Sequence, residues 1–256
     1  MKDTFDDKCR KLIDSQPNDK ARKAYERGLH TLTRKGVNSF ESLRDSILKP
    51  RPPAFMAALH LLELFDKRKA VPALLQLLHS RDELNLWEAA KSLIHVDSKL
   101  ALRGCLKLLA SDAATDTRET AAYVLTFSRG QFAVPALLCV FANEQEAVKV
   151  RAHAAEGLGN LLHLTNRRQR IWRQAAESLM SGLSDPLPEV RFWSAYALGM
   201  MGCESALPKL EELAATDKTF CSGWWTVGEE ASDAAVAIRT GYWPDIIRIG
   251  KQKTTN

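Results

Sequence analysis

The sequence predicts an all-α fold, an α-α superhelix in which five to six helix pairs stack as a right-handed solenoid behind an N-terminal helical cap. The main observation is a motif of two small residues followed, three positions on, by leucine or isoleucine. The motif recurs six times, at spacings of 32, 32, 33, 40 and 40 residues, a period typical of helical repeats. The copies begin at Ala57, Ala89, Ala121, Ala154, Ser194 and Ala234.

Each copy lies near the middle of a predicted helix. Between Val150 and Leu162, for example, apolar residues recur at i, i+4, i+5, i+8, i+11 and i+12, which is one face of a helix with 3.6 residues per turn. Alanine has a high helix propensity, and its small side chain lets neighbouring helices approach closely. These helices are therefore expected to be the second members of the pairs, packed along alanine-lined seams.

The first helix of a pair is marked by a proline near its start. Three apolar segments begin with Val71-Pro72, Val134-Pro135 and Leu207-Pro208. Proline is tolerated in the first turn because its missing N–H would have no helical partner there. Each of these prolines is therefore expected to lie in the first turn of its helix.

Together these signals divide the whole chain into elements. The predicted pairs are 39–48 with 53–66, 70–80 with 84–96, 98–110 with 116–127, 132–142 with 146–162, 168–184 with 188–201, and 205–215 with 228–240. We expect residues 1–52 to hold a helical cap and the first helix of repeat one, 53–240 the solenoid, and 241–256 a closing segment with a disordered tail. Tyr242 and Trp243 are expected to close the last repeat.

Two of the second helices carry a longer pattern around the motif. Residues 150–159 and 190–199 both approximate Val-Arg-x-x-Ala-Ala-x-Ala-Leu-Gly. This pattern resembles HEAT-like repeats, including the subgroup first noted in phycobilin lyases, and the resemblance covers about residues 53–240. It implies a fold more than a function. It also implies that the second helices line a concave side, which is the usual ligand surface of such proteins.

Composition and charge exclude several classes of protein. The chain is 45% hydrophobic and 26% charged, and its net charge of +5 arises within residues 1–52. A nucleic-acid binder would more often show a denser basic stripe. No segment is apolar enough for a secretory signal or a membrane span. The five scattered cysteines include no C-x-x-C pair. We therefore expect a cytoplasmic protein that does not engage a membrane.

The sequence carries no recognisable catalytic motif. It has no Walker A loop, no G-x-G-x-x-G, no G-x-S-x-G and no H-E-x-x-H. Some HEAT-like enzymes bind iron through His-Glu dipeptides, and this chain has none. His153 and Glu156 share a helix face, but a metal site would need two further ligands. No catalytic residue, metal or cofactor is therefore predicted.

The repeat frame points to a candidate binding surface. The residues one before, two after and six after the first motif position fall on one face of each second helix. In two of the second helices these positions are rich in aromatic residues, which are common at binding hot spots, and in the helix between those two the same positions are polar. An equally open interpretation is that the rings fill gaps between repeats. The predicted partner-binding residues are Tyr123, Phe127, His153, Glu156, Asn160, Trp193, Tyr196 and Met200.

Three arginines recur four residues before the second small residue of the motif. For Arg118, Arg151 and Arg191 a structural role is preferred over an anion-binding ladder. Each is expected to pair with a carboxylate in a turn of the same or the next repeat, which would fix the geometry between repeats. The candidate partners are Asp116, Glu146, Asp185 and Glu189.

Two segments outside the motif are unusual. The densest basic run ends in Ile171-Trp172-Arg173, and arginines beside tryptophan suit nucleic-acid contact. The run also begins an amphipathic helix, which would bury Trp172 and leave the arginines in solvent. The candidates for anion or nucleic-acid contact are Arg167, Arg168, Arg170 and Arg173. Trp224 and Trp225 are interpreted as a structural plug over the end of the solenoid, or else as a recognition loop.

The favoured function is non-catalytic recognition of another protein on the second-helix face, by a scaffold or adaptor that is a monomer or a weak oligomer. Solenoids suit this role because they present long surfaces built from rigid helices. Two alternatives stay open. One is chromophore handling of the kind found in phycobilin lyases, and the other is nucleic-acid binding through residues 167–173.

Overall fold

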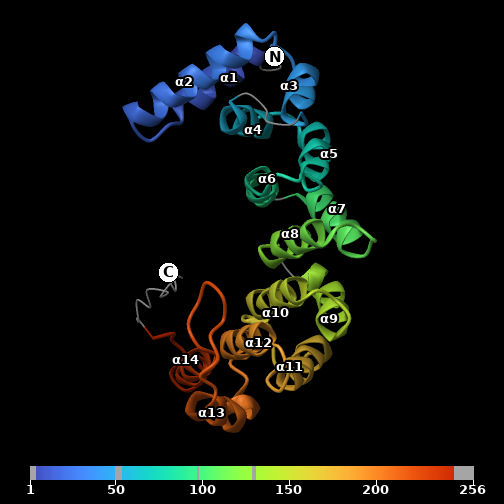
Figure 1. The fold of residues 1–256 in the computed structure, drawn as a ribbon, viewed down its shortest axis with the longest axis vertical. Helices are drawn as coiled ribbons and strands as arrows, with labels where there is room; N and C mark the ends of the chain where they lie inside the picture. Colours follow the sequence, from blue (N-terminus) through green and yellow to red (C-terminus); the bar gives the residue numbers. More distant parts are fainter. Residues whose placement is uncertain (1–3, 50–53, 97, 129–130, 245–256) are drawn as a thin grey trace, which may run out of the picture. The chain divides into compact units, whose positions relative to one another are not determined.

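The computed structural model describes residues 4–49, 54–96, 98–128 and 131–244 (Figure 1). Over these residues the chain forms fourteen α-helices, two short 3-10 helices and no β-strand. Phe220 and Thr226 form an isolated antiparallel bridge. The predicted all-α class is therefore confirmed. Residues 245–256, where a disordered tail is predicted, lie outside the described residues.

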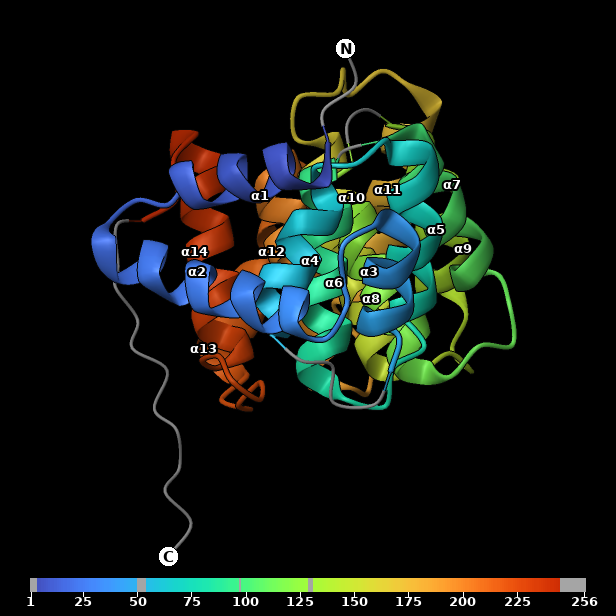
Figure 2. The ribbon, with the colours of Figure 1, turned by 90° about the horizontal axis from the view of Figure 1, so that it is seen from above.

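The chain divides into two compact units, residues 1–107 and 108–256, with the division inside α7 (Lys99–Leu109). In the N-terminal unit α1 and α2 lie side by side and both contact α4 (Figure 2). The pairs α3/α4 and α5/α6 follow, and α4 also contacts α6. The helices are α1 (Phe5–Asp14), α2 (Asp19–Arg34), α3 (Phe40–Ile47), α4 (Phe55–Glu63), α5 (Lys67–Leu77) and α6 (Glu83–Val96).

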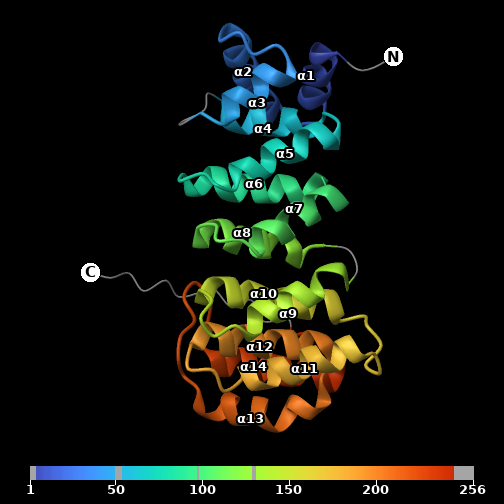
Figure 3. The ribbon, with the colours of Figure 1, turned by 90° about the vertical axis from the view of Figure 1, so that its right-hand side faces the viewer.

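The C-terminal unit is a two-layered stack. Its second helices α8, α10, α12 and α14 lie side by side in chain order, and α9, α11 and α13 form the other layer (Figures 1 and 3). Each first helix packs on the second helix that follows it. The helices are α8 (Thr115–Thr126), α9 (Val134–Ala142), α10 (Val148–Leu162), α11 (Arg170–Gly182), α12 (Pro188–Met201), α13 (Leu207–Thr216) and α14 (Val227–Thr240).

Every helix predicted from the sequence is present within a few residues of its expected ends. After α1 and α2, the described residues give the pairs α3/α4 and α5/α6 in the N-terminal unit, and α9/α10, α11/α12 and α13/α14 in the C-terminal unit. The solenoid organisation of stacked helix pairs is confirmed within each unit. The right-handed sense of the superhelix stays a prediction.

One predicted helix start is wrong. Pro135 and Pro208 lie in the first turn of α9 and α13, as predicted, but Pro72 lies well inside α5. In α9 and α13 the residues before the proline form a separate 3-10 turn. In α5, the Asp66 carboxylate accepts a hydrogen bond from the Arg68 N–H, which caps the helix more than one turn before the proline.

Neighbouring second helices pack very closely against one another. The two small residues of every motif copy are at most 5% exposed. A Cβ added to Gly159 would lie 2.7 Å from Ala197 Cα, and one added to Gly199 would lie 2.9 Å from Ala234 Cα. Because only glycine fits at these contacts, α10, α12 and α14 pack backbone against backbone. This packing holds the same face of each second helix toward solvent.

A ladder of arginine–carboxylate pairs ties successive repeats together in the C-terminal unit. Each arginine comes from a second helix, and each carboxylate lies in the turn between the two helices of the next pair. The pairs and their N–O distances are Arg118–Glu146 at 2.8 Å, Arg151–Asp185 at 2.6 Å and Arg191–Asp217 at 2.8 Å. The predicted structural role is confirmed with Glu146 and Asp185 as partners, whereas Arg191 uses Asp217, which was not among the candidates.

Candidate functional site

The predicted partner-binding residues lie together on one surface of the C-terminal unit. This surface, the second-helix face, consists of Tyr123, Phe127, His153, Glu156, Asn160, Trp193, Tyr196 and Met200. Side-chain contacts link successive helices across it. The rings of Tyr123 (α8) and His153 (α10) have centroids 5.5 Å apart, and the Tyr196 hydroxyl (α12) donates to Asn160 Oδ1 at 2.8 Å. The residues of each helix share a side because they are three, four or seven positions apart.

Phe127 is the most exposed ring among the predicted residues. It follows the last residue of α8 and is 47% exposed. The half-buried Tyr123 supports it from one turn earlier, edge to face, with ring centroids 5.0 Å apart. A large apolar side chain held in place by a second ring can bury a partner's side chain at little cost in conformational entropy.

The middle of the face is a polar strip on α10. His153 Nδ1 lies 3.0 Å from Glu156 Oε2, and His153 Nε2 lies 3.8 Å from Glu119 Oε1 of α8. Lys149 Nζ lies 3.7 Å from the other oxygen of Glu119. Burial raises the pKa of the Glu119 carboxyl, and the nearby Lys149 and His153 lower it only in part. The strip contains carboxylates and an imidazole that contact one another, and the Asn160 amide, whose oxygen accepts a hydrogen bond from Tyr196.

The α12 part of the face is an aromatic cluster. The Trp193 ring meets the Tyr196 ring at right angles with centroids 5.4 Å apart, and Tyr196 stacks on Trp243 at 5.5 Å. Trp243 Nε1 donates to Met200 Sδ at 3.0 Å. Burial, and then the nearby Glu156 and Glu230, raise the pKa of Tyr196 to about 12. The Tyr196 hydroxyl therefore stays protonated and keeps its donor role toward Asn160.

Sequence reasoning did not place two further tryptophans on this surface. Trp224, in the loop between α13 and α14, is 41% exposed, and its ring lies 5.3 Å from that of Trp193. Trp243 joins through Tyr196, whereas Tyr242 is 79% exposed and does not close the last repeat as expected. Neither tryptophan lies in the helical repeat, so the repeat frame gave no signal for them.

The loop before α14 has both buried and exposed side chains. Its Cys221 and the helix residue Val227 are buried against Phe192, with Trp225 packed beside them. Trp225 Nε1 donates to Glu230 Oε2 at 2.8 Å. Thr226 begins α14 through a reciprocal capping box with Glu229. Trp225 therefore has the contacts expected of a structural plug, and the neighbouring Trp224 is carried outward onto the second-helix face.

The basic run lies elsewhere, at the start of α11. Arg167, Arg168, Arg170 and Arg173 are all exposed. Arg167 pairs with Glu204 at 2.8 Å. Trp172 is 8% exposed and packs on the apolar side of the helix, so its ring is not available for stacking on a base. The structure thus separates the arginines from the aromatic side chain that motivated the nucleic-acid interpretation.

Burial raises the pKa of Cys105 and of Cys221 to about 12, so neither thiol is activated. Within the part of the chain that the structure describes, no three His, Cys, Asp or Glu side chains are grouped to hold a metal ion. Nor is any described helix long and apolar enough to cross a bilayer.

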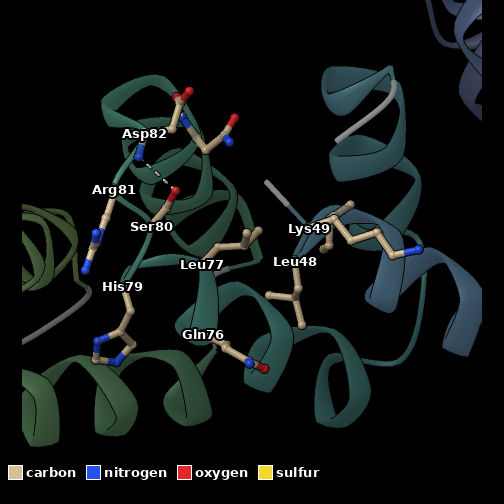
Figure 4. Close-up of a pocket in the computed structure, with 10 residues that line it drawn as sticks. Leu48, Lys49, Gln76, Leu77, His79, Ser80, Arg81 and Asp82 are labelled. Carbon is tan, nitrogen blue, oxygen red and sulfur yellow. Dashed lines mark hydrogen bonds between the residues drawn. The ribbon is translucent and has the colours of Figure 1, made fainter. Parts of the chain in front are cut away.

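A cavity of about 710 Å³ lies in the N-terminal unit between the end of α3, the end of α5 and the start of α6. In Figure 4 the side chains of Lys49 and Arg81 lie on opposite sides of it. Asp82 and Ser80 in its wall are joined by the hydrogen bond from the Asp82 N–H to Ser80 Oγ, at 3.1 Å. Recognition of a small ligand requires polar groups that converge on one point, and the charged groups of this cavity do not converge.

Comparisons with known proteins agree with this architecture. Residues 134–220 match the family model of HEAT repeats. The chain is similar to the complex of CpcE and CpcF of phycocyanin lyase from Nostoc sp. PCC7120, at 19% identity and a TM-score of 0.54 over 67% of this chain and 98% of that one. It is also similar to an engineered protein, at 18% identity and a TM-score of 0.50 over 91% of this chain and 67% of that one.

These structural likenesses concern the fold alone, because the identities are low. A search of curated proteins finds no match. The matched residues contain α9 to α13, and with them two of the three pairs of the ladder, Arg151–Asp185 and Arg191–Asp217. Residues 134–220 therefore match HEAT repeats, and the chain as a whole shares the fold of such helical-repeat proteins.

Proposed function

We propose that this chain is a non-catalytic scaffold or adaptor that binds another protein on the second-helix face, extended by Trp224. One observation carries the proposal. Half-exposed aromatic side chains from α8, α12 and the loop before α14 flank the polar strip of α10, and ring or hydrogen-bond contacts join them into one surface. Aromatic anchors beside oriented polar groups are the composition of protein-binding hot spots.

Rigidity supports the same proposal. The glycine and alanine seams and the arginine ladder fix the spacing of the second helices. A surface that is ordered before binding loses little conformational entropy when a partner docks. Nothing in the polar strip supplies an activated nucleophile, and the Tyr196 hydroxyl, whose pKa is raised to about 12, is engaged with Asn160. The face is therefore better suited to binding than to catalysis.

Site-specific photo-crosslinking tests the proposal. A photoreactive phenylalanine analogue replaces Phe127 or Trp224 in one pair of full-length chains, and Cys139, which is exposed on α9 in the other layer, in a control chain. The chains are irradiated in extract of the source cells, and the adducts are identified by mass spectrometry. We expect one protein to be captured from positions 127 and 224 and not from 139. Capture from 139 alone would contradict the proposal.

Chromophore handling is the alternative suggested by the likeness to phycocyanin lyase, but at 19% identity that likeness concerns the fold only. Addition of a free bilin to the purified chain separates the two functions. A scaffold leaves the bilin absorbance spectrum unchanged, whereas a chromophore-handling protein shifts it. Nucleic-acid binding is less favoured because Trp172 is buried beneath the exposed arginines of α11.

A further inference from the structure

Carboxylates surround the second-helix face, although the chain as a whole carries a net charge of +5. Four second helices of the C-terminal unit contribute carboxylates around the aromatic rings. Asp116 of α8, Glu156 of α10, Glu189 of α12 and Glu229 of α14 are at least partly exposed, whereas Glu119, Glu230 and Asp233 are buried. Asp116, Glu189 and Glu229 share one repeat position with Lys149, five residues before the first motif residue, so they form a row across the four helices.

The cations of these four helices do not offset that charge on the face. Lys149 lies on it, beside Glu119, and is 67% exposed. The arginines of these helices are held in pairs toward the turns and the neighbouring layer. They are Arg118 with Glu146, Arg151 with Asp185, Arg191 with Asp217, and Arg239 with Glu211 of α13. The repeat-stabilising ladder thus directs these arginines away from the face, where the exposed or partly exposed carboxylates of these helices outnumber Lys149.

The carboxylates lie close to the aromatic rings. Glu156 and Glu230 lie close enough to Tyr196 to raise the pKa of its hydroxyl, and Glu189 and Glu230 do the same for the Cys221 thiol beneath Trp225. Carboxylates therefore lie near the aromatic cluster that includes Trp193 and Trp224. Ring faces themselves attract cations, most strongly in tryptophan, so the two effects reinforce each other.

We infer that the segment bound on this face is cationic: an extended stretch of the partner protein rich in arginine or lysine. The inference rests on the proposed function and specifies the partner's chemistry by charge complementarity. An arginine guanidinium can stack on Trp193, Trp224 or Phe127 while it donates hydrogen bonds to a neighbouring carboxylate. A nucleic acid is disfavoured on this face, because its negative phosphates would meet these carboxylates.

Peptide probes of opposite charge test the inference on the full-length chain. The first probe is a short fluorescent peptide in which arginine alternates with serine and leucine, and the second replaces each arginine with glutamate. Fluorescence anisotropy at about 0.15 M salt follows binding. We expect the arginine probe to bind, with an affinity that falls as salt is added, and the glutamate probe not to bind. Equal binding of both probes, or no binding of the arginine probe, would overturn the inference.

Variants assign the binding to the face. Asp116→Asn, Glu156→Gln and Glu189→Gln remove one charge each without loss of volume, and each should weaken the arginine probe by about two- to fivefold. Lys149→Gln should strengthen it by about twofold, which mere structural damage would not do. Glu177→Gln, on the exposed side of α11, is the matched control and should change nothing. Weaker binding with Lys149→Gln, or an equal loss with Glu177→Gln, would contradict the assignment.

One experiment distinguishes failure of this inference from failure of the proposed function. Peptide mapping of the adduct captured from position 127 identifies the bound segment of the partner. A basic segment supports the inference. A neutral or acidic segment refutes the inference and leaves protein binding on this face intact. Capture only from position 139 refutes the proposed function itself.

Discussion

The Arg151–Asp185 pair offers the sharpest test of how the repeats are held together. Both side chains are nearly buried, at 5% and 8% exposure, and Arg151 Nη2 lies 2.6 Å from Asp185 Oδ2. Arg151 Nε also donates to the Phe141 carbonyl at 3.1 Å. Arg151→Met keeps the apolar stem of the side chain but leaves the Asp185 carboxylate buried without its cation. Removal of one partner of such a pair costs about 3 to 5 kcal/mol of stability.

The backbone hydrogen bond that Asp185 Oδ1 accepts from Leu187, at 2.9 Å, stays in the variant and offsets part of that cost. We therefore expect a loss near the lower limit, about 3 kcal/mol. Arg167→Met is the control, because the Arg167–Glu204 pair has the same kind of contact at 2.8 Å but side chains 55% and 72% exposed. Exposed pairs contribute about 0 to 1 kcal/mol. Arg151→Met/Asp185→Asn should recover much of the loss, since no uncompensated charge remains.

Urea unfolding followed by tryptophan fluorescence measures these differences where they arise. Five of the six tryptophans, all but Trp87, belong to the C-terminal unit. The midpoint should fall far more for Arg151→Met than for Arg167→Met. If the two variants lose the same stability, or if the double variant is no better than Arg151→Met, the ladder does not hold the repeats by buried charge pairing.

Three further predictions concern the same unit and the thiols. Burial raises the pKa of Asp217, but hydrogen bonds from Arg191 and the Thr219 N–H lower it by more, so the net pKa lies below 3.8. The ionised pair with Arg191 therefore stabilises the fold above that pH. In an acid titration this stabilisation should be lost as the pH falls through the lowered pKa, and Asp217→Asn should not show that loss. Gly159→Ala should cost about 1 to 2 kcal/mol in urea unfolding because the new Cβ meets the Ala197 backbone, which outweighs the gain in helix propensity, whereas Gly157→Ala, which mainly meets the flexible end of Leu137, should cost less. In native chains at neutral pH, iodoacetamide should label the exposed Cys139 long before Cys105 or Cys221, as intact-mass and peptide analysis would show; comparable labelling of all three would mean that the core opens readily.

The repeat architecture could be predicted from the sequence because its physical cause is local and periodic. Alanine pairs at a fixed spacing mark the seams, and these residues are buried in all six copies. Proline marked the start of the first helix in two of three cases. It failed at Pro72 because the Asp66 cap, rather than the proline, determines where α5 begins.

The candidate surface was only partly predictable. Positions within the helical register, such as Tyr123 and Tyr196, follow from the repeat frame. Trp224 and Trp243 are placed by a loop and a terminal segment, whose paths no periodicity encodes. The partner of Arg191 was missed for a similar reason. Asp217 lies 26 residues along the chain, whereas the other ladder partners lie 28 and 34 residues away, so sequence distance gave no rule.

The central claim is that the exposed aromatic side chains of the second-helix face bind a partner and do not merely pack. The most direct test is the affinity of the captured partner for Phe127→Ser, with Phe132→Ser as the control, because these two phenylalanines are 47% and 50% exposed but only Phe127 lies on the face. Both variants should change stability by less than about 1 kcal/mol. Phe127→Ser should weaken the partner at least about tenfold, and Phe132→Ser should not. Unchanged affinity with Phe127→Ser would contradict the claim.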